Sequence, residues 1–257
     1  MSARLSEFRP VRNVRQSQIA REWDAIAKTR VDQISSKRDV SARHVLLPMM
    51  RAMTADVDRT NVLDIGCGTG FIVSELSRTM DRIMAIDVSG ASIEQARSLY
   101  SGRKNLRFAQ TSVERHARTE ATGGYTLATA NMVLMTAVNL RRTLAAINSL
   151  LQAGGHLVLT ITHPWFWPEY WGYAKAPWFS YDREIAIEAP FAISWDLDGA
   201  LRTTHIHRPL HAYFDAMVQH GFEVETLVEP FPSQRVQRMY PKPWVFPRFL
   251  GMRCKKV

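Results

Sequence analysis

Three closely spaced glycines are the residues of this 257-residue chain that most directly imply ligand chemistry. They lie in the stretch from Asn61 to Gly70, NVLDIGCGTG, and an amphipathic segment begins at Phe71. The pattern predicts a buried strand, a tight turn and the start of a helix. Glycine suits such a turn because a Cβ would obstruct its backbone angles and the approach of a ligand. Free amides at the helix start would point at that ligand, so the stretch predicts a nucleotide-binding turn; a turn that binds nothing is the alternative.

The spacing of the glycines distinguishes between nucleotide classes. A dinucleotide-binding G-x-G-x-x-G motif would use Gly66 and Gly68 and would need a third glycine where this chain has Phe71. Here the third glycine is Gly70, and Asp64 precedes the turn, which gives D-x-G-x-G-x-G. The pyrophosphate-binding interpretation therefore fails.

This D-x-G-x-G-x-G stretch resembles the first motif of the class I S-adenosylmethionine-dependent methyltransferases. In that family the turn carries a cationic amino-acid moiety instead of phosphates, and a carboxylate suits the ammonium group of such a ligand. The resemblance implies S-adenosylmethionine as cofactor and S-adenosylhomocysteine as product. It also implies cofactor contacts at Asp64, Gly66, Cys67, Gly68, Thr69 and Gly70.

A second acid, Asp87, ends the next apolar run, RIMAID. It follows the first glycine by about 20 residues, the separation at which one β-α-β step carries a carboxylate to the ribose hydroxyls of a nucleotide. We therefore expect Asp87 to bind the ribose and the adjacent Val88 to contact the cofactor. The alternative is that Asp87 only caps the following helix, a role that Ser89 or Ser92 could also fill.

Two further strand ends complete the expected cofactor site. After the third strand, LRFAQ, the family usually has an acid that accepts a hydrogen bond from the adenine amino group. This chain departs from that pattern and has Ser112 there, which can accept without supplying charge, with Val113 against the adenine face. After the fourth strand, Asn131 and Met132 resemble the fourth motif of the family, which implies cofactor contacts from both, with Asn131 at the amino-acid end. The alternative is that Asn131 only forms a turn.

Aromatic residues crowd the segment from about 165 to 204, which lacks helical periodicity and follows the fifth strand. We expect an insertion that forms the substrate pocket and lid, because aromatic faces suit a planar or cationic acceptor and exclude water from the sulfonium. The alternatives are a small satellite core or a dimer contact and, for Trp23 of the N-terminal helix, a core anchor. The candidate substrate-binding residues are Trp23, Trp165, Trp167, Tyr170, Tyr181, His205 and His207.

Histidines supply the candidate base. His163, at the end of the fifth strand beside the expected sulfonium, is the candidate catalytic residue, as a base or as a group that orients the acceptor. Its alternative role is a hydrogen bond to the insertion backbone. His205 and His207 alternate on a predicted strand and so share a face, but no third ligand has suitable spacing, and no metal is expected.

The composition is that of a globular protein, with 46% hydrophobic and 22% charged residues. No apolar run approaches the ~18 residues of a membrane span. The two cysteines lack metal-ligand spacing, which suits a reducing, cytoplasmic location. The formal charge of +9 would fit a nucleic-acid partner, but the charge is spread outside the N-terminal region, so we favour a basic surface.

Strands and helices alternate after the glycine turn, which predicts an α/β fold with a doubly wound sheet. The resemblance implies a seven-stranded, mostly parallel sheet of the Rossmann-like methyltransferase type, with the last strand antiparallel beside the fifth. We expect helices from Ser17, over 41–47 with Pro48 ending or kinking it, and over 140–152 with Ala153-Gly154-Gly155 as its cap. The expected parts are an N-terminal arm and helical lid (1–55), a cofactor-binding core (56–163), the aromatic insertion (164–207) and the C-terminal part of the sheet (208–257).

These features together predict a methyltransferase that uses S-adenosylmethionine and acts on an N, O or C atom of a small, aromatic or heterocyclic acceptor. The alternatives are an RNA or protein methyltransferase, which the basic charge would favour, and an S-adenosylmethionine-binding protein without turnover. The expected partner is the small-molecule acceptor; neither nucleic acid nor a membrane is expected, and the chain would act as a monomer or homodimer.

Overall fold

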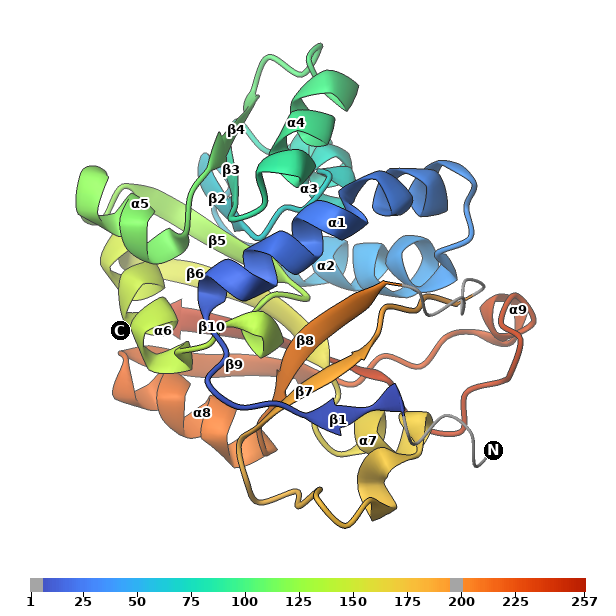
Figure 1. Ribbon diagram of the computed structural model, residues 1–257. Coiled ribbons are helices and arrows are strands. Elements are labelled where there is room, and N and C mark those ends of the chain that lie inside the picture. The colour runs from blue at the N-terminus through green and yellow to red at the C-terminus, as the bar shows by residue number, and fades with distance from the viewer. Residues whose placement is uncertain (1–6, 195–200) are drawn as a thin grey trace.

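A seven-stranded sheet forms the centre of the molecule in the computed structural model, which describes residues 7–194 and 201–257 (Figure 1). Its strands are β2 (Asn61–Ile65), β3 (Arg82–Asp87), β4 (Leu106–Gln110), β5 (Tyr125–Asn131), β6 (Leu151–Thr162), β9 (Phe222–Val228) and β10 (Phe249–Lys256). They lie in the order β4-β3-β2-β5-β6-β10-β9. Strands β2 to β6 are parallel, and β10 is antiparallel to both of its neighbours. The predicted doubly wound, Rossmann-like fold is confirmed.

Helices cover both faces of this sheet. They are α2 (Leu47–Met53), α3 (Phe71–Leu76), α4 (Gly90–Leu99), α5 (Val113–Thr119), α6 (Leu140–Leu150), α8 (Leu210–Gln219) and the short α9 (Gln234–Gln237), with 3-10 turns at Ser77–Thr79 and Leu134–Thr136. Val62 packs in a core with α2 and α3, whereas its neighbour Leu63 packs in a core with α6 and α8. Successive side chains of a strand point to opposite faces, so the sheet is buried on both sides.

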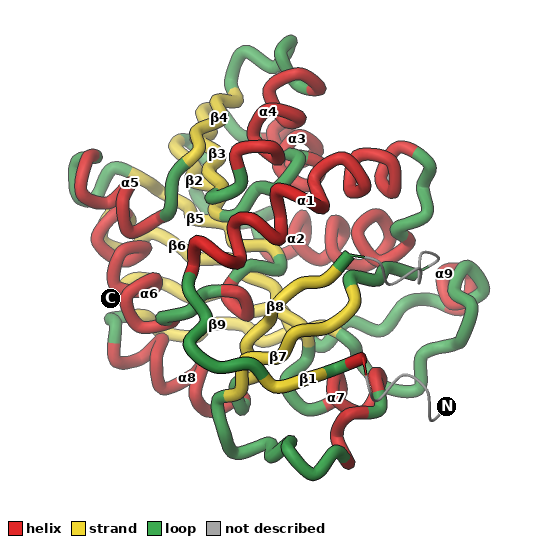
Figure 2. The backbone as a smooth tube through the Cα atoms, in the orientation of Figure 1, coloured by secondary structure: helices red, strands yellow, loops and turns green. Residues whose placement is uncertain are grey.

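A smaller antiparallel sheet and a long helix lie in front of the large sheet in the view of Figure 1. The small sheet has the order β1-β7-β8, from β1 (Arg9–Pro10), β7 (Ile185–Pro190) and β8 (Arg202–His207). The helix is α1 (Gln16–Ser35), which Figure 2 shows crossing the strands of the large sheet. Across the two described ranges, no helix combines the length and the apolarity needed to cross a membrane.

The aromatic insertion contains more regular structure than its sequence pattern indicated. The strand predicted to carry His205 and His207 is present as β8. The helix α7 (Phe166–Trp171), a 3-10 turn at Tyr173–Lys175 and the strand β7 were not predicted. Its aromatic side chains are partly buried on several sides of these short elements, so no single periodicity appears. Residues 195–200, which include the predicted pocket residue Trp195, and residues 1–6 of the N-terminal arm lie outside the described residues.

Two predicted helix ends differ from the structure. Pro48 does not end its helix, because a π-helical turn at Ala42–Leu46 continues into α2 and Pro48 lies inside this continuous helix. Prolines and π-helical turns are both common positions of helix kinks, and the kink at Pro48 stays a prediction. The cap expected at 153–155 is also absent, because α6 ends at Leu150 and β6 begins at Leu151. Gly154, with φ +71°, instead lies where the pairing of β5 with β6 changes register.

Candidate active site

A cavity of about 350 Å³ opens at the carboxyl ends of β2, β3 and β5, and α1 forms part of its wall. Ligands of parallel α/β sheets bind at this edge. The part that we call the turn half is lined by Gly66, Cys67, Gly68, Thr69, Asp87, Val88, Ser112, Val113, Asn131 and Met132. The part that we call the aromatic half is lined by Phe8, Trp23, Trp167, Tyr170, Phe191, His205 and Arg248.

The glycines of the turn take left-handed backbone angles, with φ of +65° at Gly66, +53° at Gly68 and +87° at Gly70. A Cβ on Gly66 would lie 2.3 Å from Val133 Cγ2, whereas a Cβ on Gly68 would meet no protein atom within 4 Å. Gly68 therefore leaves open space on the side where a ligand approaches the main chain. Gly70 does not line the cavity; it stands at the N-terminus of α3.

Asp87 lies at the cavity wall after β3 and holds the turn in place. One carboxylate oxygen accepts a hydrogen bond from the Gly68 N–H (2.8 Å) and the other from the Ser89 N–H (2.8 Å). Burial raises the pKa of Asp87. The hydroxyl of Ser89 caps α4 by accepting from the Ser92 N–H, so this helix has a cap other than Asp87.

Asp64 lies behind the turn, outside the cavity lining, and only 3% of it is exposed. Its carboxylate accepts a hydrogen bond from the Thr129 hydroxyl on β5. Burial raises the pKa of Asp64 to about 7, and the nearby Asp87 adds to this effect although the Thr129 bond opposes it. The carboxyl group therefore joins two strands beneath the turn.

Three residues from the other strand ends line the turn half: Ser112, Asn131 and Met132. The Ser112 hydroxyl accepts from the Arg115 N–H as the cap of α5, so its own proton remains for a ligand acceptor. Asn131 accepts from the Thr160 hydroxyl through its side-chain oxygen. Met132 has φ +59°, a left-handed conformation that is uncommon for a residue with a side chain and is often found at functional sites.

The aromatic half is assembled from segments that are far apart in the sequence. Trp23 of α1 meets Phe191, which follows β7, edge to face at 5.7 Å between ring centroids. The ring centroid of Trp167 on α7 lies 5.9 Å from that of Tyr170 and 6.0 Å from that of Phe249 on β10. No two of the contributing elements are neighbours in the large sheet, so tertiary packing creates this half.

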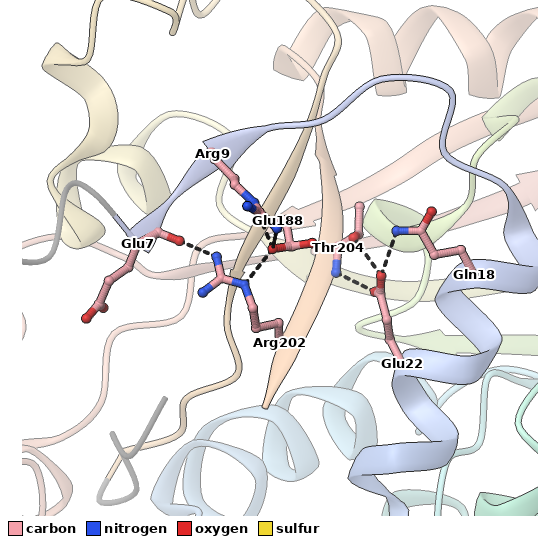
Figure 3. Close-up of polar contacts among 7 residues, drawn as sticks. All are labelled: Glu7, Arg9, Gln18, Glu22, Glu188, Arg202 and Thr204. Atoms are coloured by element: carbon pink, nitrogen blue, oxygen red, sulfur yellow. Dashed lines mark hydrogen bonds and ion pairs between the residues drawn. The ribbon is translucent and has the colours of Figure 1, made fainter. Parts of the chain in front are cut away.

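Polar contacts tie α1 to the elements around the cavity. Glu22 accepts hydrogen bonds from the backbone N–H and the hydroxyl of Thr204 on β8, at 2.7 and 3.0 Å (Figure 3). Asp24 accepts from the Ser89 hydroxyl at 2.7 Å, and Gln16 accepts from the Val138 N–H at 3.1 Å. The helix is thus fastened to the small sheet, to the start of α4 and to the loop after β5.

The small sheet carries an ion-pair cluster on its edge. Glu188 of β7 pairs with Arg9 of β1 at 2.8 Å and with Arg202 of β8, and Arg202 also donates to the Glu7 carbonyl (Figure 3). These contacts join the N-terminal strand to the insertion. Phe8, which lies between Glu7 and Arg9 in the sequence, is buried and lines the cavity.

Four other predicted site residues do not line this cavity: His163, Trp165, Tyr181 and His207. Trp165 is 54% exposed and packs edge to face against Tyr181 at 4.8 Å. His207 is buried and bonds to the Tyr181 carbonyl at 3.0 Å. The insertion therefore sends only part of its aromatic and imidazole side chains toward the cavity, and the rest pack among themselves.

His163 lies outside the cavity lining, and both of its ring nitrogens make hydrogen bonds within the protein. Its Nε2 lies 2.7 Å from the Glu229 carboxylate, and its Nδ1 accepts from the N–H groups of Trp165 and Phe166 at 3.3 and 3.2 Å. Burial lowers the pKa of His163 although Glu229 opposes this. These bonds to the insertion backbone match the structural alternative for this residue, and His163 is not part of the cavity lining.

His205 is the predicted imidazole that lines the cavity. Its Nε2 lies 3.3 Å from the hydroxyl of Tyr173, which is buried. Burial lowers the pKa of His205 to about 4, so the ring is neutral at pH 7. Within residues 7–194 and 201–257, no group of three or more His, Cys, Asp or Glu side chains could hold a metal ion.

Several cavity residues escaped the sequence reasoning. Phe8 comes from the N-terminal arm, which only the pairing of β1 with β7 brings to the site, so no local pattern marks it. Phe191 belongs to the predicted aromatic insertion but was not among the candidate substrate-binding residues. Glu114 lines the turn half and accepts from the Thr143 hydroxyl at 2.6 Å. Arg248 was detectable, because an arginine at the start of an apolar strand, RFLGM, is an unusual residue for a buried position.

Comparison with known proteins agrees with this geometry. Residues 56–171 match the protein family described as a methyltransferase domain. The biotin biosynthesis bifunctional protein of Cellvibrio japonicus (strain Ueda107) is 28% identical over 109 residues, which are 39% of this chain and 21% of that protein. The matched region thus spans about a fifth of the length of this relative.

Solved structures share the fold. An S-adenosylmethionine-dependent methyltransferase from Mesorhizobium loti has a TM-score of 0.57 at 20% identity, covering 81% of this chain and 96% of that one. The 1,6-didemethyltoxoflavin-N1-methyltransferase of Burkholderia thailandensis, solved with 1,6-didemethyltoxoflavin and S-adenosylhomocysteine, has a TM-score of 0.62 at 15% identity, covering 97% and 95%. At these identities the likeness concerns the fold.

Proposed function

We propose that the chain is a class I S-adenosylmethionine-dependent methyltransferase that methylates an N, O or C atom of a small aromatic or heterocyclic acceptor. The match of residues 56–171 to a methyltransferase domain and the shared fold support the first part of this proposal. One observation carries the proposal: the cavity that begins at the glycine turn continues into the aromatic half, between α1, α7 and the small sheet. Its volume of about 350 Å³ falls within the roughly 300–1,000 Å³ of small-molecule sites.

The turn half fits S-adenosylmethionine. Gly68 offers open space beside its main chain, and each oxygen of Asp87 that accepts one N–H keeps a lone pair for a ribose hydroxyl. The side-chain NH2 of Asn131 makes no hydrogen bond within the described part of the chain and is available to a ligand carboxylate. When bound here, the cofactor supplies a methyl group on a cationic sulfur.

The aromatic half would place and enclose the acceptor. Methyl transfer is an in-line displacement, and correct placement of the two reactants can supply much of the rate. The rings of Trp23, Trp167 and Tyr170 offer flat apolar surfaces for a planar acceptor and keep water from the reacting atoms. The Burkholderia thailandensis relative, whose name specifies a heterocyclic acceptor, supports this assignment by analogy of fold.

His205 is the imidazole in the cavity wall, and a base is needed only for acceptors that must lose a proton. A neutral imidazole can accept a proton, but a pKa of about 4 makes His205 a weak base. We therefore assign His205 to orienting the acceptor and expect placement, more than base catalysis, to determine the rate.

The test is a transfer assay with labelled S-adenosylmethionine. Wild-type protein is incubated with a panel of nitrogen heterocycles and phenols and, separately, with bulk tRNA and a peptide mixture. We expect label in the small molecules only. Label confined to tRNA or peptide would overturn the proposal.

A matched pair of variants links the activity to the cavity. Trp167→Ala removes a ring of the cavity wall, whereas Trp165→Ala removes an exposed ring two residues away that lies outside it. We expect Trp167→Ala to lower kcat/KM about tenfold or more, the scale of losing one well-packed aromatic contact, and Trp165→Ala to leave it nearly unchanged. Equal effects would contradict the assignment of the aromatic half.

A further inference from the structure

Arg248 is a buried cation in the wall of the aromatic half. It precedes β10, lines the cavity and is 6% exposed. Its Nε is buried and has no hydrogen-bond partner, and one terminal nitrogen donates to the Lys242 carbonyl at 3.3 Å. Within the described part of the chain no carboxylate pairs with this guanidinium.

Aromatic rings hold this guanidinium in place. Its central carbon lies 3.9 Å from the ring centroid of Tyr170, 4.7 Å from that of Trp244 and 5.3 Å from that of Tyr240. Such stacking fixes the plane of the guanidinium while leaving the N–H groups at its edge for a ligand. The side chain is therefore positioned before any ligand arrives.

Among the described residues, the other buried arginine, Arg208, and the half-buried Arg30 are both paired. Arg208, 2% exposed, donates to Glu184 at 2.7 Å and to two backbone carbonyls. Arg30, in the same cavity wall as Arg248, pairs with Asp39 at 2.9 Å. Burying a charge without an opposite charge is costly, and burial lowers the pKa of Arg248 accordingly. The protein thus keeps one unpaired positive charge beside the proposed acceptor.

We propose that Arg248 binds a carboxylate of the methyl acceptor, so that the acceptor is an aromatic or heteroaromatic acid; this inference rests on the proposed function. A guanidinium binds a carboxylate through two parallel N–H···O bonds, and burial strengthens the pair. One unpaired positive charge balances the single charge of a carboxylate better than the double charge of a phosphate monoester.

The test is calorimetric titration of the protein saturated with S-adenosylhomocysteine. Benzoate and nicotinate are the probes, benzamide and nicotinamide are their neutral counterparts of equal shape, and phenyl phosphate tests the other oxyanion. We expect the acids to bind at least about thirtyfold more tightly than the amides, because a buried charge pair has this scale. Phenyl phosphate binding more tightly than benzoate would overturn the carboxylate assignment.

Variants of two arginines at β10 separate charge from fold. Arg248→Met keeps a long apolar side chain between the rings and should weaken acid binding by about thirtyfold or more. Arg248→Lys keeps the positive charge but not the two parallel N–H donors of a guanidinium, so it should lose less acid affinity. Arg253→Met is the control, because Arg253 pairs with Glu225 and Asp56 and does not line the cavity. The affinity for S-adenosylhomocysteine should be equal in all of them and shows that each variant is folded.

Three results would overturn the inference: equal binding of acids and amides, acid binding that survives Arg248→Met, or a loss of S-adenosylhomocysteine affinity in that variant, which would make Arg248 a cofactor ligand. The transfer assay separates this failure from that of the proposed function. If acids bind no more tightly than amides while small aromatic molecules still accept the methyl group, only the carboxylate inference fails. If tRNA or peptide alone accepts the methyl group, the proposed function fails as well.

Discussion

The two halves of the cavity are built in different ways. The turn half comes from residues 66 to 132, and its shape depends on the main chain: left-handed glycines, strand ends and N–H groups that Asp87 holds in place. The aromatic half draws on residues 8 to 249, and its shape depends on side chains from α1, α7, the small sheet and the start of β10. The shape of the turn half is thus set within one β-α-β region, whereas the shape of the aromatic half is set by the whole fold.

This difference indicates which changes each half tolerates. A substitution in the turn half disturbs a backbone arrangement that serves one ligand, so its effect should be confined to cofactor binding. A substitution in the aromatic half should alter the acceptor without altering the cofactor. The experiments below test this separation, beginning with the largest expected effect.

The first prediction concerns Asp64, the buried acid behind the turn half, and its effect on the free energy of unfolding. The folded protein holds the carboxyl proton up to about pH 7, whereas in the unfolded chain the group ionises near its ordinary pKa of 3.8, so its ionisation opposes folding. This contribution to the free energy of unfolding falls as the pH rises from about 4 to 7, by up to about 4 kcal/mol.

Asp64→Asn removes this ionisation and can still accept the hydrogen bond of Thr129. We expect the variant to match the wild type near pH 4 and to be more stable above pH 7, as measured by urea unfolding across this range. Asp81→Asn, at an exposed position, is the control. A stability difference that does not grow with pH would refute the buried-acid explanation.

Asp87 tests the cofactor contact itself. Asp87→Asn leaves one of the two N–H groups of Gly68 and Ser89 facing an amide NH2, and it removes the charge near the ribose position. We expect affinity for S-adenosylhomocysteine to fall about thirtyfold, or about 2 kcal/mol, in calorimetry. An unchanged dissociation constant would remove the ribose assignment of this residue.

Glu22 tests how far the aromatic half depends on α1. Glu22→Ala removes the hydrogen bonds that Thr204 of β8 donates to α1, seen in Figure 3. We expect kcat/KM for the acceptor to fall about tenfold, the scale of losing hydrogen bonds to a charged group, with cofactor affinity nearly intact. Asp32→Ala, an exposed change on the same helix, should have no effect on either quantity. A parallel loss of cofactor affinity would show that the halves are coupled.

His163 should have the smallest effect on activity. His163→Ala removes hydrogen bonds to the start of α7 and to Glu229, so we expect a melting temperature lower by a few degrees and turnover within about threefold of wild type. His211→Ala, on an exposed face of α8, is the control. A large loss of turnover together with a changed pH–rate profile would restore His163 as a base.

The difference between the turn half and the aromatic half also explains which site residues could be predicted from the sequence. The alternation of strands and helices, the glycine turn and Asp87 follow from patterns within about 30 neighbouring residues, which a single β-α-β step links directly. The antiparallel last strand came only from the family resemblance. Phe8 carries no such pattern, because its place depends on the pairing of β1 with β7, far along the chain. Trp165 and Trp167 differ by two positions and have opposite surroundings, which the composition of the segment could not distinguish.

The position of β10 has a consequence for how the protein is made. This strand lies between β6 and β9, and in the large sheet it is the only partner of β9. The ribosome synthesises β10 after every other described element. Until β10 has left the ribosome, β9 therefore lacks its partner strand in the large sheet. All residues of the turn half are synthesised before Arg248 and Phe249, which are the last described residues of the cavity wall. The cofactor site should thus be able to form before the acceptor site is complete.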